Sequence, residues 1–172
     1  SLVELLRNAG VARLYLTDWR SATSEMRYFS IDTYLADLNI AVDEIGPPVD
    51  LVGLCQGGWL SLLYAARFPG KVRRLVFAGS PIDVSAPSQI SMMVASLPQP
   101  GIETMVHQAD GIIRGQHMRQ FWSMPFSPSD VEAALQRELL KSEAGEALLD
   151  RFKRWNRETL DLPGTYYLEV TD

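Results

Sequence analysis

The only cysteine of this 172-residue chain lies in the hexapeptide Gly53-Leu54-Cys55-Gln56-Gly57-Gly58. A reactive residue flanked by glycines two positions before and after it is typical of a nucleophile elbow, a sharp turn between a strand and a helix. The residue at the tip of such a turn has a strained backbone, and the neighbouring chain passes so close that a Cβ atom at either glycine would block it. The hexapeptide therefore requires a strand before Cys55 and a helix after it.

Both flanking segments have the required pattern. Residues 49–52 form a short apolar run after Pro47-Pro48, as expected for a buried parallel strand. After the hexapeptide, apolar residues recur at helical spacing until Pro69-Gly70, at Trp59, Leu62, Leu63, Ala66 and Phe68. A lone cysteine is often a buried core residue, but this order of strand, turn and helix favours a nucleophile.

The predicted turn has chemical consequences. It would present the Cys55 sulfur above the sheet, with the backbone N–H of Gln56 directed at a carbonyl oxygen that becomes negative during attack. The positive end of the following helix would favour the thiolate, which is the nucleophilic form of cysteine. The sequence therefore predicts Cys55 as nucleophile, Gln56 as oxyanion donor, and Gly53 and Gly57 as the glycines of the elbow.

The rest of the first half continues the alternation of helices and strands. Apolar spacing and end signals predict a helix over 2–9 stopped by Gly10, a strand over 11–16, a helix capped by Ser30 and closed by Gly46-Pro47, and a strand over 72–78. Strands separated by helices indicate an α/β fold with a parallel sheet covered on both faces.

After Asp83 the pattern changes. Residues 84–101 are rich in proline and serine and predict a loop, and the chain from Glu103 onward is mainly helical. Helical signals there include a capping box at Ser129 and Glu132, and an apolar stripe at Leu148, Phe152, Trp155 and Thr159. We therefore predict a core over 1–84 and a mainly helical lid over 85–172, placed over the carboxyl ends of the strands where open parallel sheets bind ligands.

Composition excludes several classes of protein. With 16 basic and 21 acidic residues the net charge is −5, which argues against nucleic acid as a partner. No apolar run approaches the roughly 20 residues of a membrane span. A single cysteine cannot form an internal disulfide, which favours a reduced, cytoplasmic setting. No cluster of residues has metal-ligand spacing and no glycine-rich phosphate loop occurs, so we expect neither a metal nor a bound cofactor.

Three segments together resemble polyhydroxyalkanoate synthases: Tyr15-Leu16-Thr17-Asp18-Trp19, the helix start Ser30-Ile31-Asp32-Thr33-Tyr34, and the cysteine hexapeptide. A looser resemblance covers Trp155-Asn156, Asp161-Leu162-Pro163-Gly164 and Tyr166-Tyr167-Leu168. The resemblance implies an α/β-hydrolase fold and an acyltransferase that builds polyester from (R)-3-hydroxyacyl-coenzyme A through an acyl-cysteine at Cys55. It also implies the polyester chain as a partner, with the polymer granule surface and a homodimer as further candidates.

Two alternatives stay open at this point. Intracellular polyhydroxyalkanoate depolymerases have a segment similar to residues 79–83, but their cysteine box usually has proline where this chain has Gly57; a thioesterase-type hydrolase would share the fold and resolve the acyl-cysteine with water. The other alternative is a non-catalytic, granule-associated domain that keeps the elbow only as structure. In this fold the base histidine and its acid partner follow later strands, so we expect both outside the 172 residues, and the chain alone to be inactive.

Further candidates have weaker support. Asp83, after the strand over 72–78, is a candidate triad acid, although the sequence favours a helix-cap or turn aspartate. His107 and His117 fall in the helical segment and are expected to be surface or lid residues. Two larger sets are expected to be ordinary core or surface: the tryptophans that could line an acyl pocket, Trp19, Trp59 and Trp122, and the basic residues that could meet coenzyme A phosphates, Arg151, Lys153, Arg154 and Arg157.

Overall fold

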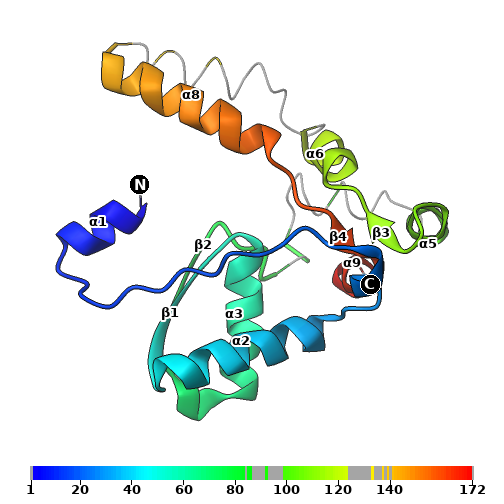
Figure 1. Ribbon diagram of the computed structural model, residues 1–172, viewed down its shortest axis with the longest axis horizontal. Helices are drawn as coiled ribbons and strands as arrows, with labels where there is room; N and C mark the ends of the chain where they lie inside the picture. Colours follow the sequence, from blue (N-terminus) through cyan, green and yellow to red (C-terminus); the bar gives the residue numbers. More distant parts are fainter. Residues whose placement is uncertain are drawn as a thin grey trace.

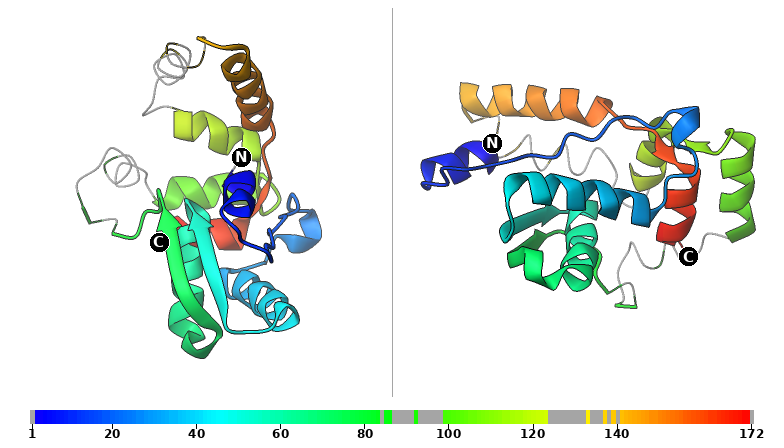
Figure 2. Two further views of the ribbon diagram at one scale, coloured as in Figure 1. Left: turned by 90° about the vertical axis from the view of Figure 1, so that its left-hand side faces the viewer. Right: turned by 60° about the horizontal axis from the view of Figure 1, so that its bottom comes forward.

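A computed structural model gives the arrangement of the chain (Figure 1). It describes residues 2–83, 85–86, 92, 99–123, 133, 137, 139 and 141–171. A parallel sheet and two helices beside it come from the first half of the chain, and a mainly helical segment from the second half lies at one end of them (Figures 1 and 2). The expected α/β fold class is therefore confirmed.

The central unit is the predicted strand, turn and helix. Strand β1 (Val49–Leu54) pairs in parallel with β2 (Val72–Ala78), and helix α3 (Gln56–Arg67) connects them through the short 3-10 helix η2 (Pro69–Lys71). The register places Leu54 opposite Ala78, so both strands end at the same edge of the sheet. Because Cys55 directly follows β1, this edge also carries the cysteine.

Helix α2 (Ile31–Ile45) is the best-defined helix predicted from the sequence. The Ser30 hydroxyl accepts from the Thr33 N–H, and the Thr33 hydroxyl accepts from the Ser30 N–H, so both orphan N–H groups have partners. Gly46, at φ 92°, ends the helix as expected. Leu35 and Val42 pack against Leu60 and Tyr64 of α3 and form the main core.

The buried face of α3 differs from the predicted one. Leu60, Ser61 and Tyr64 are buried, whereas Leu62 is half-buried and Leu63 is exposed. The helix is apolar on most sides, so its sequence period fits more than one face, and the contacts with α2 and the sheet decide between them. The predicted stripe through Leu62 and Leu63 instead lines a pocket described below.

The sheet is covered on one face by the described residues. Apolar side chains on the face opposite α3 are exposed: Val52, Leu54 and Val76. The alternation of strands and helices predicted a sheet covered on both faces, and the described part of the chain provides only the α3 side.

The prediction of a strand over residues 11–16 was wrong. Helix α1 (Leu2–Asn8) ends as expected, with Gly10 at φ 91°, but the residues after it form no ladder. They cross the molecule as an extended chain, and Leu16 is 79% exposed (Figure 1). A strand requires a neighbour for its backbone hydrogen bonds, and β1, the nearest candidate in the alternating pattern, pairs with β2 alone among the described residues.

The second half of the chain is mainly helical, as predicted. It contains α5 (Gln99–Gln108), α6 (Gly115–Ser123), α8 (Glu143–Arg157) and α9 (Gly164–Thr171), together with the two-residue strands β3 (Ile112–Ile113) and β4 (Leu162–Pro163). The two short strands pair antiparallel and were not predicted, because two residues are too few to show a period. A second hydrophobic core, formed by residues of α5, β3, α6 and α9, contains Ile102, Val106, Ile113, Met118 and Tyr167.

The more detailed predictions about this half have different outcomes. The stripe on α8 exists, but Leu148, Phe152 and Trp155 are exposed, and Thr159 lies beyond the end of the helix. The capping box at 129–132 and most of the loop over 84–101 fall outside the described residues, and the domain boundary at residue 84 stays a prediction. None of the helices in the described part is long and apolar enough to cross a membrane.

The cap of α2 yields a stability prediction. Replacing Ser30 by alanine removes the acceptor for the Thr33 N–H, and we expect a loss of about 1 kcal/mol in the free energy of unfolding, measured by denaturant titration. Thr23→Ala is the matched control, because Thr23 precedes the 3-10 helix η1 (Ser24–Met26) and its side chain makes no capping hydrogen bond. Equal losses in both variants would contradict the assigned cap.

Candidate active site

Cys55 occupies a strained turn between β1 and α3. Its backbone has φ 51° and ψ −120°, a positive φ that non-glycine residues adopt at a cost of about 1–3 kcal/mol. Two hydrogen bonds hold the turn: the Cys55 N–H donates to the Ala78 carbonyl of β2 at 3.0 Å, and the Gly58 N–H donates to the Cys55 carbonyl at 3.0 Å. The pairing of β1 with β2 therefore extends directly into the turn.

Glycine is required at two positions around Cys55. A Cβ atom on Gly53 would lie 2.3 Å from the carbonyl oxygen of Gly57, because the first turn of α3 crosses over the end of β1. A Cβ atom on Gly58 would lie 2.6 Å from the Ser80 Cβ. At Gly57 a Cβ atom would meet nothing within 4 Å, so the second crowded glycine is Gly58, which the sequence pattern did not single out.

The Cys55 side chain is exposed and lies next to the first turn of α3. The leading N–H groups of a helix have no partner within that helix. Those of Gln56 and Gly57 belong to this set, and the Gly58 N–H is already bonded to Cys55. An oxygen that gains negative charge beside the sulfur would therefore find backbone donors, as the prediction for Gln56 requires.

Aromatic rings from three helices pack beside this turn. Tyr166 of α9 is edge-on to Tyr34 of α2 at 5.0 Å between ring centroids, and it stacks on Trp59 of α3 at 6.2 Å. Trp19 in turn packs edge-on against Tyr34 at 5.3 Å. Trp19 and Trp59 are thus members of one cluster near Cys55, whereas the side chain of Trp122 lies outside the described residues.

Tyr166 also makes a polar contact with the elbow. Its hydroxyl donates to the Gln56 side-chain oxygen at 3.4 Å. Burial of the ring, with smaller contributions from Tyr34 and Cys55, raises the pKa of Tyr166 to about 12, so the phenol is neutral at neutral pH. In the sequence, Tyr166 stands out only as part of a helix start, because nothing there reveals a contact across 110 residues.

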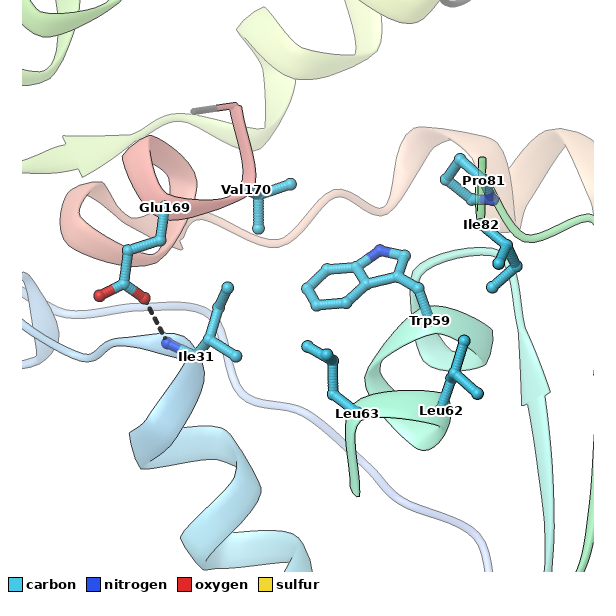
Figure 3. A pocket seen from close by; sticks show the side chains of 8 residues that line it. All are labelled: Ile31, Trp59, Leu62, Leu63, Pro81, Ile82, Glu169 and Val170. Carbon is cyan, nitrogen blue, oxygen red and sulfur yellow. Dashed lines mark hydrogen bonds between the residues drawn. The ribbon is translucent and has the colours of Figure 1, made fainter. Parts of the chain in front are cut away.

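A second contact from α9 reaches the start of α2. The Glu169 carboxylate accepts from the Ile31 N–H at 2.7 Å, which gives a further orphan N–H of α2 a partner (Figure 3). Beside this pair lies an open cavity of about 300 Å³. Its wall is largely apolar and comes from α2, α3, α9 and the loop after β2, with Ile31, Trp59, Leu62, Leu63, Pro81, Ile82, Glu169 and Val170 around it (Figure 3).

The other candidates make no hydrogen bond to Cys55 within the described part of the chain. Asp83 accepts from the Ser85 N–H at 3.0 Å and from the Ser85 hydroxyl at 2.6 Å, and these hydrogen bonds lower the pKa of its carboxyl. This is the geometry of a turn aspartate. His107 and His117 are both exposed, on α5 and α6, and neither has a hydrogen bond to Cys55 among the described residues. Within the same residues, no group of His, Cys, Asp and Glu could hold a metal ion.

The return from α8 to α9 is fixed by one aspartate. The Asp161 carboxylate accepts from Arg114 at 2.8 Å and from the Gly115 N–H at the start of α6 at 2.9 Å. Its backbone carbonyl accepts from the Ala22 N–H, and its backbone N–H donates to the Ser21 hydroxyl, both in the extended segment that follows α1. Asp161 therefore joins the helical segment to the core side of the molecule, at the entrance to α9.

Comparison with known proteins agrees with this geometry. The family model described as the alpha/beta hydrolase fold matches residues 2–166. The chain belongs to the α/β hydrolase fold family. Within that family, the turn at Cys55 has the position and backbone conformation of a nucleophile elbow.

Several proteins to which the chain is similar are named poly(3-hydroxyalkanoate) polymerases. The chain is 38% identical over 96 residues to the poly(3-hydroxyalkanoate) polymerase subunit PhaC of Synechocystis, covering 52% of this chain and 25% of that protein. It is 35% identical over 83 residues to the subunit of the same name from Allochromatium vinosum, covering 45% and 23%. Poly(3-hydroxyalkanoate) polymerase 1 of Ectopseudomonas oleovorans is 24% identical over 169 residues, covering 92% and 29%. The chain thus spans about a quarter of the length of these relatives.

The two elbow glycines provide a matched test of the turn. Gly53→Ala places a Cβ atom against the backbone of α3, and we expect a loss of about 1–3 kcal/mol in the free energy of unfolding. Gly57→Ala faces open space in a helix, where alanine is the better helix former, and should leave stability unchanged or slightly higher. Chemical denaturation of both variants measures the difference, and a Gly57→Ala loss as large as that of Gly53→Ala would refute the close crossing of α3 over β1.

The raised pKa of Tyr166 gives a pH dependence at the alkaline end. Well below pH 10, Tyr166 is protonated in both the folded and the unfolded protein. Between about pH 10 and pH 12 the unfolded chain loses this proton while the folded protein keeps it. The free energy of unfolding should therefore fall with rising pH in that window, by about 1 kcal/mol per pH unit from this residue. Tyr166→Phe should remove that part of the slope between pH 10 and 11. Equal slopes in the variant and the parent would contradict the shift.

Proposed function

We propose that the protein is a polyhydroxyalkanoate synthase-like acyltransferase in which Cys55 attacks the thioester carbonyl of a hydroxyacyl-coenzyme A. The observation that carries the proposal is the exposed cysteine at a strained elbow, with φ 51°, in a chain similar to proteins named polymerases. A hydrolytic enzyme would need the same elbow, but the named relatives favour transfer to a growing polyester.

The reaction follows from the groups at the turn. The Cys55 sulfur, after losing its proton to a base, adds to the carbonyl carbon, and the carbonyl oxygen becomes an oxyanion that the Gln56 N–H stabilises. When the oxyanion collapses, the coenzyme A thiolate leaves and takes a proton, which leaves an acyl-cysteine. The hydroxyl of a second hydroxyacyl group or of the polymer end then gives its proton to the base and attacks the acyl carbon. An ester forms as the C–S bond breaks, and the sulfur leaves as a thiolate that can start the next cycle.

The residues near Cys55 define what the site offers to a substrate. The aromatic rings and the largely apolar cavity beside Trp59 are suited to an acyl chain, since the charged side chain in the cavity wall, Glu169, is exposed and already accepts from the Ile31 N–H. The polyester chain is the second substrate under this proposal, and coenzyme A enters only as part of the thioester. The cytoplasmic setting, the granule surface and a homodimer stay predictions.

Trapping of the acyl-enzyme tests the nucleophile. In the whole protein, Cys55→Ala should abolish covalent labelling by radiolabelled 3-hydroxybutyryl-coenzyme A, because the sulfur that forms the acyl-enzyme is then missing. Cys55→Ser should keep the unfolding midpoint of the parent while losing most activity, since a hydroxyl lacks the nucleophilicity of a thiolate near neutral pH. Persistent label in the alanine variant would refute the assignment.

Analysis of the product separates transfer from hydrolysis. Polymer formed from the hydroxyacyl thioester supports the synthase, whereas free hydroxy acid as the sole product would show a thioesterase or depolymerase at the same cysteine. A Cys55 that neither acylates nor reacts with iodoacetamide in the folded protein would indicate a non-catalytic domain.

A further inference from the structure

The ring of Tyr166 is held on two sides at the elbow. It is 6% exposed and lies between Tyr34 of α2, edge-on at 5.0 Å, and Trp59 of α3, stacked at 6.2 Å. A ring with neighbours on both sides and little access to solvent has few alternative rotamers. The position of the Tyr166 hydroxyl is therefore set by the packing of α9 against α2 and α3.

The partner of that hydroxyl is the residue that follows the nucleophile. Tyr166 donates to the Gln56 side-chain oxygen at 3.4 Å, across 110 residues of sequence. The pKa of about 12 keeps the phenol protonated, so it remains a donor over the whole range in which a thiolate enzyme works. The contact thus links the end of the helical segment to the first residue of α3.

Control of Gln56 matters because of its backbone. Under the proposed function its N–H faces the oxyanion, and groups that stabilise a transition state act well only within about 0.5 Å of the productive geometry. A hydrogen bond from a fixed donor restricts the rotation of the Gln56 side chain and with it the start of α3.

We propose that Tyr166 is a positioning residue for acyl transfer at Cys55, acting through its hydrogen bond to the Gln56 side chain. The inference rests on the proposed function for its substrate, while the contact itself concerns only the elbow and α9. Under this inference, efficient acylation of Cys55 requires the packing of α9 against α2 and α3 that holds Tyr166 in place.

The first experiment removes one atom. Tyr166→Phe keeps the ring and its packing but deletes the donor, and in the whole protein it should lower the rate of Cys55 acylation about five-fold, the effect of one neutral hydrogen bond. The rate is measured as the pre-steady-state burst with p-nitrophenyl acetate and as kcat with 3-hydroxybutyryl-coenzyme A, with KM unchanged. Tyr167→Phe is the matched control, because Tyr167 is the next residue of α9, is also 6% exposed and packs in the other core cluster.

A double-mutant cycle tests the route through Gln56. Gln56→Met keeps the length of the side chain and removes the acceptor, so Tyr166→Phe should cost nothing more in that background. Alkylation by iodoacetamide provides a readout of the sulfur alone, since this displacement forms no oxyanion. Its rate across pH should be the same in Tyr166→Phe as in the parent.

The outcomes separate the inference from the proposed function. Losses that multiply in the double variant, equal losses in Tyr167→Phe, or an equal drop in alkylation would overturn the positioning role and leave the polymerase proposal intact. An ester burst that shows the predicted coupling without any reaction of the hydroxyacyl thioester would overturn the proposed substrate and leave the inference standing. A parent protein without a burst from either compound would overturn both.

Discussion

The positive φ of Cys55 is the constraint on which the rest of the site depends. An L-residue at φ 51° and ψ −120° is unfavourable on its own, so the surrounding structure must hold it. Here the hydrogen bond from Cys55 to Ala78 ties the turn to β2, and the missing side chain of Gly53 allows the first turn of α3 to cross the end of β1. The parallel pairing of two short strands is therefore what exposes the sulfur.

Among the described residues, helix α9 of the helical segment contacts this turn, through the hydrogen bond from Tyr166 to Gln56. Asp161 fixes the entrance to α9 by binding Arg114 and the start of α6, and Glu169 joins the other end to α2. Between these two anchors lies Tyr166, against Gln56 and Trp59. A segment anchored on both sides of a contact can transmit its own position to that contact, which is the physical basis for treating α9 as part of the site.

Local features of the sequence predicted the local structure well. The cap at Ser30, the stop at Gly46 and the glycine next to the crossing, Gly53, each follow from the chemistry of a few adjacent residues, and the structure has all three. The prediction of a strand over 11–16 was wrong for the opposite reason. The apolar pattern of these residues is compatible with a strand, but a strand forms only if a neighbouring strand supplies hydrogen bonds. The crowding at Gly58 depends on Ser80 of another segment and could not be deduced from spacing.

The same distinction explains why Gln56 was found and Tyr166 was not. The role of Gln56 follows from its place after Cys55, because the residue after the nucleophile of an elbow supplies a backbone N–H to the oxyanion. Tyr166 lies 110 residues away, and its side chain reaches the elbow only because α9 packs against both α2 and α3. The strained backbone of Cys55 is thus held by the adjacent strand β2, whereas the position of the Gln56 side chain depends on Tyr166, which is distant in sequence. Loss of the α9 contact should therefore disturb the chemistry of the site more than the fold of the turn, since the hydrogen bond to Ala78 and the clearance at Gly53 do not involve α9.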